Sequence, residues 1–67
     1  MNWFTNRRQA WIAEMLAIYG FINREHLERK FGISRPQASA DLQAFLKAHP
    51  EIAHYDTSRK AYVLTSR

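Results

Sequence analysis

The chain contains no cysteine, and this absence excludes several classes of protein at once. Disulfide-bonded scaffolds, zinc sites built from thiolates and cysteine nucleophiles all require a residue that the sequence does not have. The stability of the fold must therefore come from side-chain packing. The absence also fits a reducing environment, and we expect a cytoplasmic protein.

Glycine, proline and long apolar runs are also scarce. With two glycines, two prolines and 46% hydrophobic residues, the composition is that of a folded chain and not of a disordered segment. No apolar stretch approaches the roughly 20 residues that cross a bilayer, so we expect no membrane contact. A chain of 67 residues buries only about 60% of its unfolded surface, which predicts a single domain spanning residues 1–67 with a small core.

Motifs for catalysis and for metal binding are missing as well. His26, His49 and His54 do not have the spacing of metal ligands, and there is no glycine-rich phosphate loop, nucleophile motif or pair of catalytic carboxylates. We therefore predict no enzymatic activity, no metal and no cofactor. A core this small gives no argument for a small-molecule pocket, so we expect any sensing to reside in a partner or in another domain.

What the sequence does have is a surplus of positive charge. Ten Lys and Arg residues against six Asp and Glu give a net charge of +4, and the pI is about 10.0. This balance favours a phosphate backbone or another anionic surface as partner, without choosing between them.

Apolar periodicity predicts a first helix from about Thr5 to Tyr19, ended by Gly20. Its inner stripe consists of Ile12, Met15, Leu16 and Tyr19. A further set of large apolar residues widens the arc beyond what one buried face needs; it comprises Trp3, Phe4, Trp11 and Ile18. These residues either complete the core or form the interface of a homodimer.

Two capping signals predict the next helices. Asn23 is an N-cap flanked by Ile22 and Leu27, which form a hydrophobic staple, and Gly32 ends the second helix. Ser34 begins the third helix, with Gln37 completing a capping box. Apolar spacing predicts a buried stripe formed by Ala38, Leu42, Phe45 and Leu46, and places Leu27, Phe31 and Ile33 in the same core.

The pattern after Pro50 changes to short β-type runs, from Ile52 to Tyr55 and from Ala61 to Leu64, joined by a segment with Arg59 and Lys60. This predicts a β-hairpin with a basic tip. The predicted order is three helices followed by two strands, with a glycine-containing turn between the second and third helices. The expected fold class is therefore α+β, mainly α: a winged helix-turn-helix with a two-stranded hairpin as wing.

The residues of this helix-turn-helix and wing resemble the N-terminal domain of WYL-domain bacterial transcriptional regulators and, more distantly, DeoR-type winged helices. The resemblance is carried by Phe21-Ile22-Asn23-Arg24, Leu27, Phe31-Gly32-Ile33-Ser34, Pro36-Gln37-Ala38-Ser39, Asp41-Leu42, Tyr55-Asp56 and Lys60-Ala61-Tyr62-Val63. Such regulators continue into a larger region, so the chain is expected to be either a stand-alone regulator or one domain of a longer protein.

The resemblance implies a double-stranded DNA partner read by the third helix. The implied reading surface is formed by Ser34, Arg35, Gln37, Ser39, Ala40 and Gln43, and the full set of expected DNA contacts adds Pro36, Lys47, Arg59 and Lys60. Arg35 suits either a phosphate or guanine, Gln37 and Gln43 suit adenine, and the wing suits the backbone. Asp41 is assigned to local structure, whereas Arg7 and Arg8 are either solvated or in contact with phosphate.

Three functions compete at this point. The leading hypothesis is a sequence-specific regulator of a bacterium or phage, expected to be a repressor because occupancy alone suffices for repression, and acting as a homodimer. The alternatives are an architectural or recombination accessory factor of a mobile element, and a winged helix that binds protein in place of DNA.

Overall fold

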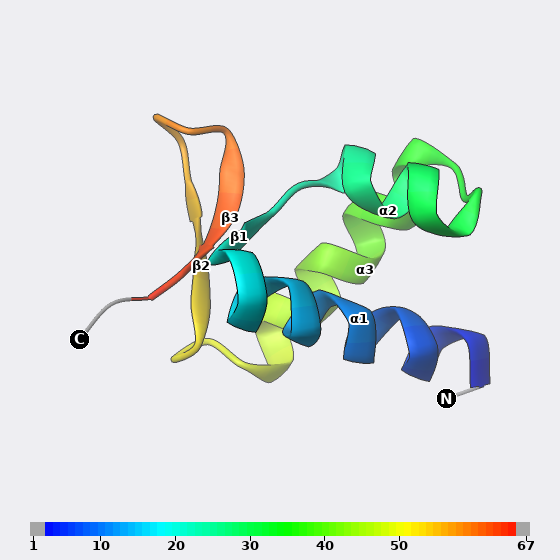
Figure 1. Ribbon diagram of the computed structural model, residues 1–67, viewed down its shortest axis with the longest axis horizontal. Coiled ribbons are helices and arrows are strands. Elements are labelled where there is room, and N and C mark those ends of the chain that lie inside the picture. The colour runs from blue at the N-terminus through cyan, green and yellow to red at the C-terminus, as the bar shows by residue number, and fades with distance from the viewer. Residues whose placement is uncertain (1–2, 66–67) are drawn as a thin grey trace.

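Three helices and a small antiparallel sheet make up the fold. The computed structural model describes residues 3–65, and Figure 1 shows the helices gathered at one end with a hairpin standing at the other. In chain order the elements are α1 (Trp3–Tyr19), β1 (Phe21–Ile22), α2 (Arg24–Phe31), α3 (Arg35–Ala48), β2 (Ala53–Asp56) and β3 (Ala61–Leu64). The predicted winged helix-turn-helix is confirmed, with α1 beginning two residues earlier than expected.

The sheet has one strand more than the predicted hairpin. Its order is β1-β3-β2, so β3 is the central strand. Antiparallel pairing joins Ile22 to Tyr62 on one side of β3 and Tyr55 to Tyr62 on the other. The predicted two-stranded hairpin is present as β2 and β3. Strand β1 was not predicted, because a strand of two residues is too short to show an alternating pattern.

Both predicted glycine stops are confirmed. Gly20 and Gly32 adopt φ values of 82° and 64°, the left-handed region that costs glycine no strain. The N–H of Gly32 donates to the carbonyl of Glu28 at 2.9 Å, closing the last turn of α2. The chain can therefore reverse between α2 and α3 within a few residues.

Both predicted N-cap side chains accept hydrogen bonds from the first turn of their helix. The bonds made by the residue three positions after each N-cap differ from the prediction. The Asn23 side chain accepts from the N–H groups of Glu25 and His26, and His26 Nδ1 accepts from the Asn23 N–H at 3.2 Å, which makes an unpredicted capping box. Ser34 Oγ accepts from the Gln37 N–H at 3.3 Å. The second half of the predicted box at α3 was wrong, because the Gln37 side chain bonds to Asp41 instead.

The core draws on every element. The largest fully buried side chains are Ile12, Leu16, Ile22, Leu27 and Leu42. Half-buried residues that pack against this core are Trp11, Met15, Phe31, Ile33, Leu46 and Tyr62. Within residues 3–65, none of the helices has the length and apolar character that crossing a bilayer requires. The core fixes α3 against α1 and α2, which positions the outward face of α3.

Candidate nucleic-acid interface

The outward face of α3 carries the residues predicted to read DNA. Ala38 and Leu42 are at most 1% exposed and anchor the helix to the core. Ser39 is half-buried, and the exposed members of the predicted set are Ser34, Arg35, Pro36, Gln37, Ala40, Gln43 and Lys47. The helix therefore presents a mostly uncharged, hydrogen-bonding surface with Arg35 at its start and Lys47 in its last turn.

At the start of α3, Arg35 makes a loose ion pair across the helix-turn-helix. Its Nε lies 3.7 Å from Glu28 Oε2, and its side chain is 61% exposed. That Glu28 oxygen is buried and has no hydrogen-bond partner among the described residues. The guanidinium is therefore held near the N-terminus of α3 by charge, while its N–H groups stay available to a ligand.

Asp41 lies beneath this face at the centre of a buried polar network. It is 3% exposed and forms an ion pair with Arg8 of α1, whose Nη2 also donates to Oδ1 at 3.3 Å. Gln37 Nε2 donates to Oδ1 at 2.9 Å, and Gln9 Nε2 donates to the Asp41 carbonyl at 2.8 Å. The structural role expected for Asp41 is confirmed. Arg8 is not the solvated charge that one alternative expected, and its contact with phosphate stays a prediction.

The other predicted cations lie on α1 and at the wing tip. Arg7 is exposed, with its guanidinium 5.2 Å from the centroid of the Trp3 ring. At the wing tip, Asp56 Oδ1 accepts from the N–H groups of Ser58 and Arg59, which forms the turn. Lys60 follows with φ 56°. Arg59 and Lys60 are therefore held at an exposed tip beyond the end of the strands.

The wing and α3 meet in a polar groove of about 510 Å³. Gln43 Nε2 donates to the Tyr62 hydroxyl at 3.2 Å, and the Tyr62 ring packs on Tyr55 at a centroid distance of 4.9 Å. Arg24, at the start of α2, also lines this groove. Sequence reasoning did not assign Arg24 or Tyr62 to the site, although both lie in segments that carried the family resemblance.

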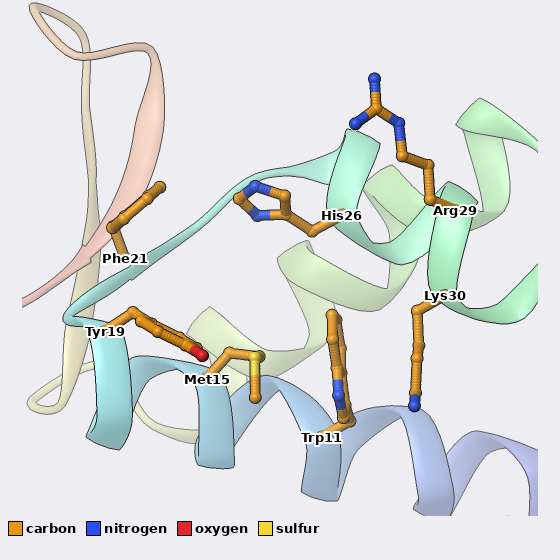
Figure 2. A pocket seen from close by; sticks show the side chains of 7 residues that line it. All are labelled: Trp11, Met15, Tyr19, Phe21, His26, Arg29 and Lys30. Carbon is orange, nitrogen blue, oxygen red and sulfur yellow. The ribbon is translucent and has the colours of Figure 1, made fainter.

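A second groove, of about 490 Å³, lies between α1 and α2. Figure 2 shows Trp11 and Met15 projecting from α1 toward α2, and Lys30 extending from α2 back toward α1. The rest of its wall is formed by Tyr19, Phe21, His26 and Arg29. The small core gave no reason to expect this groove, and it shares no residue with the predicted DNA contacts.

The residues predicted to form a dimer interface occupy different environments. Trp3, Phe4 and Ile18 are 63%, 66% and 59% exposed. Trp11 instead packs edge-on against Phe31 at a centroid distance of 5.5 Å and belongs to the layer around the core. Trp11 therefore already serves the packing of α1 on α2.

No cluster of metal ligands is formed by residues 3–65, where no three His, Asp or Glu side chains come together. The features that converge are a helix pair joined by a tight turn, an exposed α3 face and a basic hairpin beside it. These define a winged helix-turn-helix domain. Residues 5–67 match the BrxR transcriptional regulator winged helix-turn-helix domain, and the chain belongs to that family.

Similar proteins in several bacteria carry the name DNA-binding transcriptional repressor CapW. The chain is 43% identical over 61 residues, 91% of its length, to the DNA-binding transcriptional repressor CapW of Escherichia coli strain KTE188, and covers 20% of that protein. It is 40% identical over 65 residues, 97% of its length, to CapW of Stenotrophomonas maltophilia, of which it covers 22%. The chain thus spans about a fifth of the length of these relatives. The resemblance to WYL-type regulators is confirmed for this domain.

Proposed function

We propose that this chain is the DNA-binding domain of a sequence-specific transcriptional repressor that reads double-stranded DNA with α3. The observation that carries the proposal is the outward face of α3, where exposed amide and guanidinium groups stand on a helix anchored by Ala38 and Leu42. Amide and guanidinium groups match the hydrogen-bonding edges of bases in the major groove. The name of the CapW relatives, DNA-binding transcriptional repressor, agrees with this function.

Different side chains of α3 suit different groups on the DNA. Arg35 suits a bidentate contact to guanine, and Gln37 and Gln43 suit adenine, each such contact discriminating by about 1–3 kcal/mol. Ala40 suits the methyl group of thymine. In the first turn of α3 the N–H groups of Gln37 and Ala38 are bonded to Ser34, so the Arg35 N–H is the backbone donor that suits a phosphate. Ser39 and Pro36 flank these groups on the same surface.

Backbone contacts come from cations at the edge of the site. Lys47 lies in the last turn of α3, and Arg59 and Lys60 lie at the wing tip, all exposed. Such cations displace counterions from phosphates, so they set register and affinity and carry little sequence information. Binding should therefore weaken steeply as salt rises.

The proposed repressor acts as a homodimer, because the DNA-contacting surface of one domain is small. One such domain buries roughly 600–1,000 Å² on DNA, so two copies on a two-fold site raise both affinity and specificity. Occupancy of a promoter is enough to repress, and the proposal includes no catalysis. The place of action is the cytoplasm, where bacterial DNA is found.

Fluorescence anisotropy tests the proposal with two duplexes, one from upstream of the chain's own gene and one scrambled to the same length. We expect tighter binding to the upstream duplex. Arg35→Ala and Gln37→Ala should each remove most of that preference, by about 1–3 kcal/mol per contact. Lys60→Ala is the matched control, since it should weaken binding to both duplexes equally.

The other outcomes assign a different function. Equal and salt-sensitive binding to both duplexes, and to further promoter fragments, indicates an architectural factor. No binding to any duplex at low salt contradicts the proposal and indicates a winged helix that binds protein.

A further inference from the structure

We propose that Tyr62 of the wing is a positioning residue that orients the Gln43 amide on α3 for reading adenine. The proposal rests on the DNA-reading function proposed above. It deepens that function because it names the base that Gln43 reads and places one determinant of specificity outside α3. The observation behind it is the hydrogen bond from Gln43 Nε2 to the Tyr62 hydroxyl, 3.2 Å long, between residues 19 positions apart.

Tyr62 is the fixed member of this pair. It lies on β3, the central strand, and is paired with Ile22 on one side and with Tyr55 on the other. Its ring is half-buried, packs against the core and meets the Tyr55 ring at 4.9 Å. Gln43, by contrast, is exposed. The hydroxyl is therefore a stationary acceptor, and the bond determines where the Gln43 side chain points.

The Gln43 side chain keeps hydrogen-bonding groups for DNA after it has bonded to Tyr62. The Gln43 nitrogen carries two N–H groups, and the bond to Tyr62 uses one of them. The other N–H and the carbonyl oxygen form a donor-acceptor edge, which matches N7 and the N6 amino group of adenine in the major groove. An unheld glutamine side chain would lose rotamer freedom on binding, and the bond to Tyr62 lowers that cost in advance.

Gln37 provides an internal comparison on the same helix. Its Nε2 is also held, but by Asp41 of α3 at 2.9 Å and not by the wing. Removing the Tyr62 hydroxyl should therefore relax specificity at the base pair that Gln43 reads and leave the one that Gln37 reads unchanged.

The experiment is a selection of bound sequences from randomised duplexes, followed by titration of the selected duplex and its single-base variants. Gln43→Ala identifies the base pair that depends on Gln43. We expect the wild-type protein to prefer adenine there by about 5- to 150-fold. Tyr62→Phe, which keeps the ring contact with Tyr55, should reduce that preference about 2- to 10-fold.

Two further variants separate positioning from folding. Tyr55→Phe removes a hydroxyl from the neighbouring strand, where no bond to Gln43 exists, and should leave the preference intact. Gln43→Glu should shift the preference at the same base pair toward cytosine, whose amino group donates to a carboxylate. Circular dichroism at the selection temperature checks that each variant is folded.

The possible failures are distinct. If the wild-type protein selects no sequence, the proposed function fails and this inference fails with it. If a sequence is selected but Tyr62→Phe retains the full adenine preference, or Gln43→Ala weakens all duplexes equally, the inference alone is overturned.

Discussion

Asp41 is a buried residue of α3 whose side chain and carbonyl connect that helix to α1. It is the buried charged residue among residues 3–65, and its partners Arg8, Gln9 and Gln37 come from both α1 and α3. A buried carboxylate needs such partners because leaving water is costly for a charge. The network therefore joins α1 to α3, the helix proposed to read DNA.

Replacing Asp41 with Ala should destabilise the fold by about 3–5 kcal/mol, because it leaves the Arg8 guanidinium, only 13% exposed, without a counter-charge. Urea unfolding followed by circular dichroism measures the loss. The double variant Arg8→Met, Asp41→Leu is the control, since it removes both charges and keeps apolar volume, and it should recover most of the stability. A double variant as unstable as Asp41→Ala would contradict this account.

The same network marks the limit of sequence reasoning at single residues. Asp41 could be assigned to structure, because a carboxylate facing phosphates would be repelled. Its partner could not be found, since Arg8 lies 33 positions away and the periodicity of α1 gives no reason to single it out. Gln37 was predicted to complete a capping box from its spacing to Ser34. Its bond to Asp41 could not be predicted, because that bond depends on the burial of the carboxylate.

At the scale of elements, the turn between α2 and α3 fixes the geometry of the helix pair. Gly32 adopts φ 64° there, and a Cβ added at this position would meet no atom within 4 Å. The cost of Gly32→Ala is therefore conformational, and we expect a loss of about 1–2 kcal/mol. Thermal unfolding measures it.

Gly32→Asn is the matched control for this position. Asparagine tolerates the left-handed region better than alanine, so it should lose less stability. Equal losses for the two variants would contradict the conformational account, because the tolerance of asparagine for the left-handed region would then have no effect on stability.

The helix boundaries could be predicted from local sequence signals, whereas strand β1 of the sheet could not. Asn23, Gly32 and Ser34 act through their own backbone neighbourhood, so their roles could be predicted. Strand β1 forms because Phe21 and Ile22 reach β3, more than 35 residues later in the chain, and no local pattern encodes that pairing. The predicted hairpin was correct since β2 and β3 are adjacent in sequence. The Gln43–Tyr62 contact, like β1, depends on where β3 lies.

At the scale of the whole molecule, the exposed apolar residues of α1 are the surface where we expect two copies to associate. Phe4 and Ile18 are 14 residues apart, which places them about 21 Å apart along the helix axis. They are 66% and 59% exposed, so each contributes little to packing within one copy. An antiparallel arrangement of two α1 helices would bring the start of one against the end of the other and cover both residues.

We expect the wild-type chain to show a dimer at high concentration in sedimentation equilibrium, and Phe4→Ser and Ile18→Ser each to weaken that dimer. Removing an apolar side chain from an interface costs about 1–3 kcal/mol, a shift of roughly 5- to 150-fold in the dissociation constant. Thermal unfolding of dilute samples should change little, because both side chains lie outside the core.

Trp11→Phe is the informative contrast, since Trp11 packs on Phe31 within one copy. It should lower the thermal midpoint while leaving the dissociation constant nearly unchanged, because its ring contributes to the packing of α1 on α2. If Trp11→Phe weakens association and the exposed-residue variants do not, the interface lies on the groove side of α1. If the wild-type chain stays monomeric at every concentration, α1 alone does not drive association, and binding to a two-fold DNA site would have to draw on contacts outside this helix.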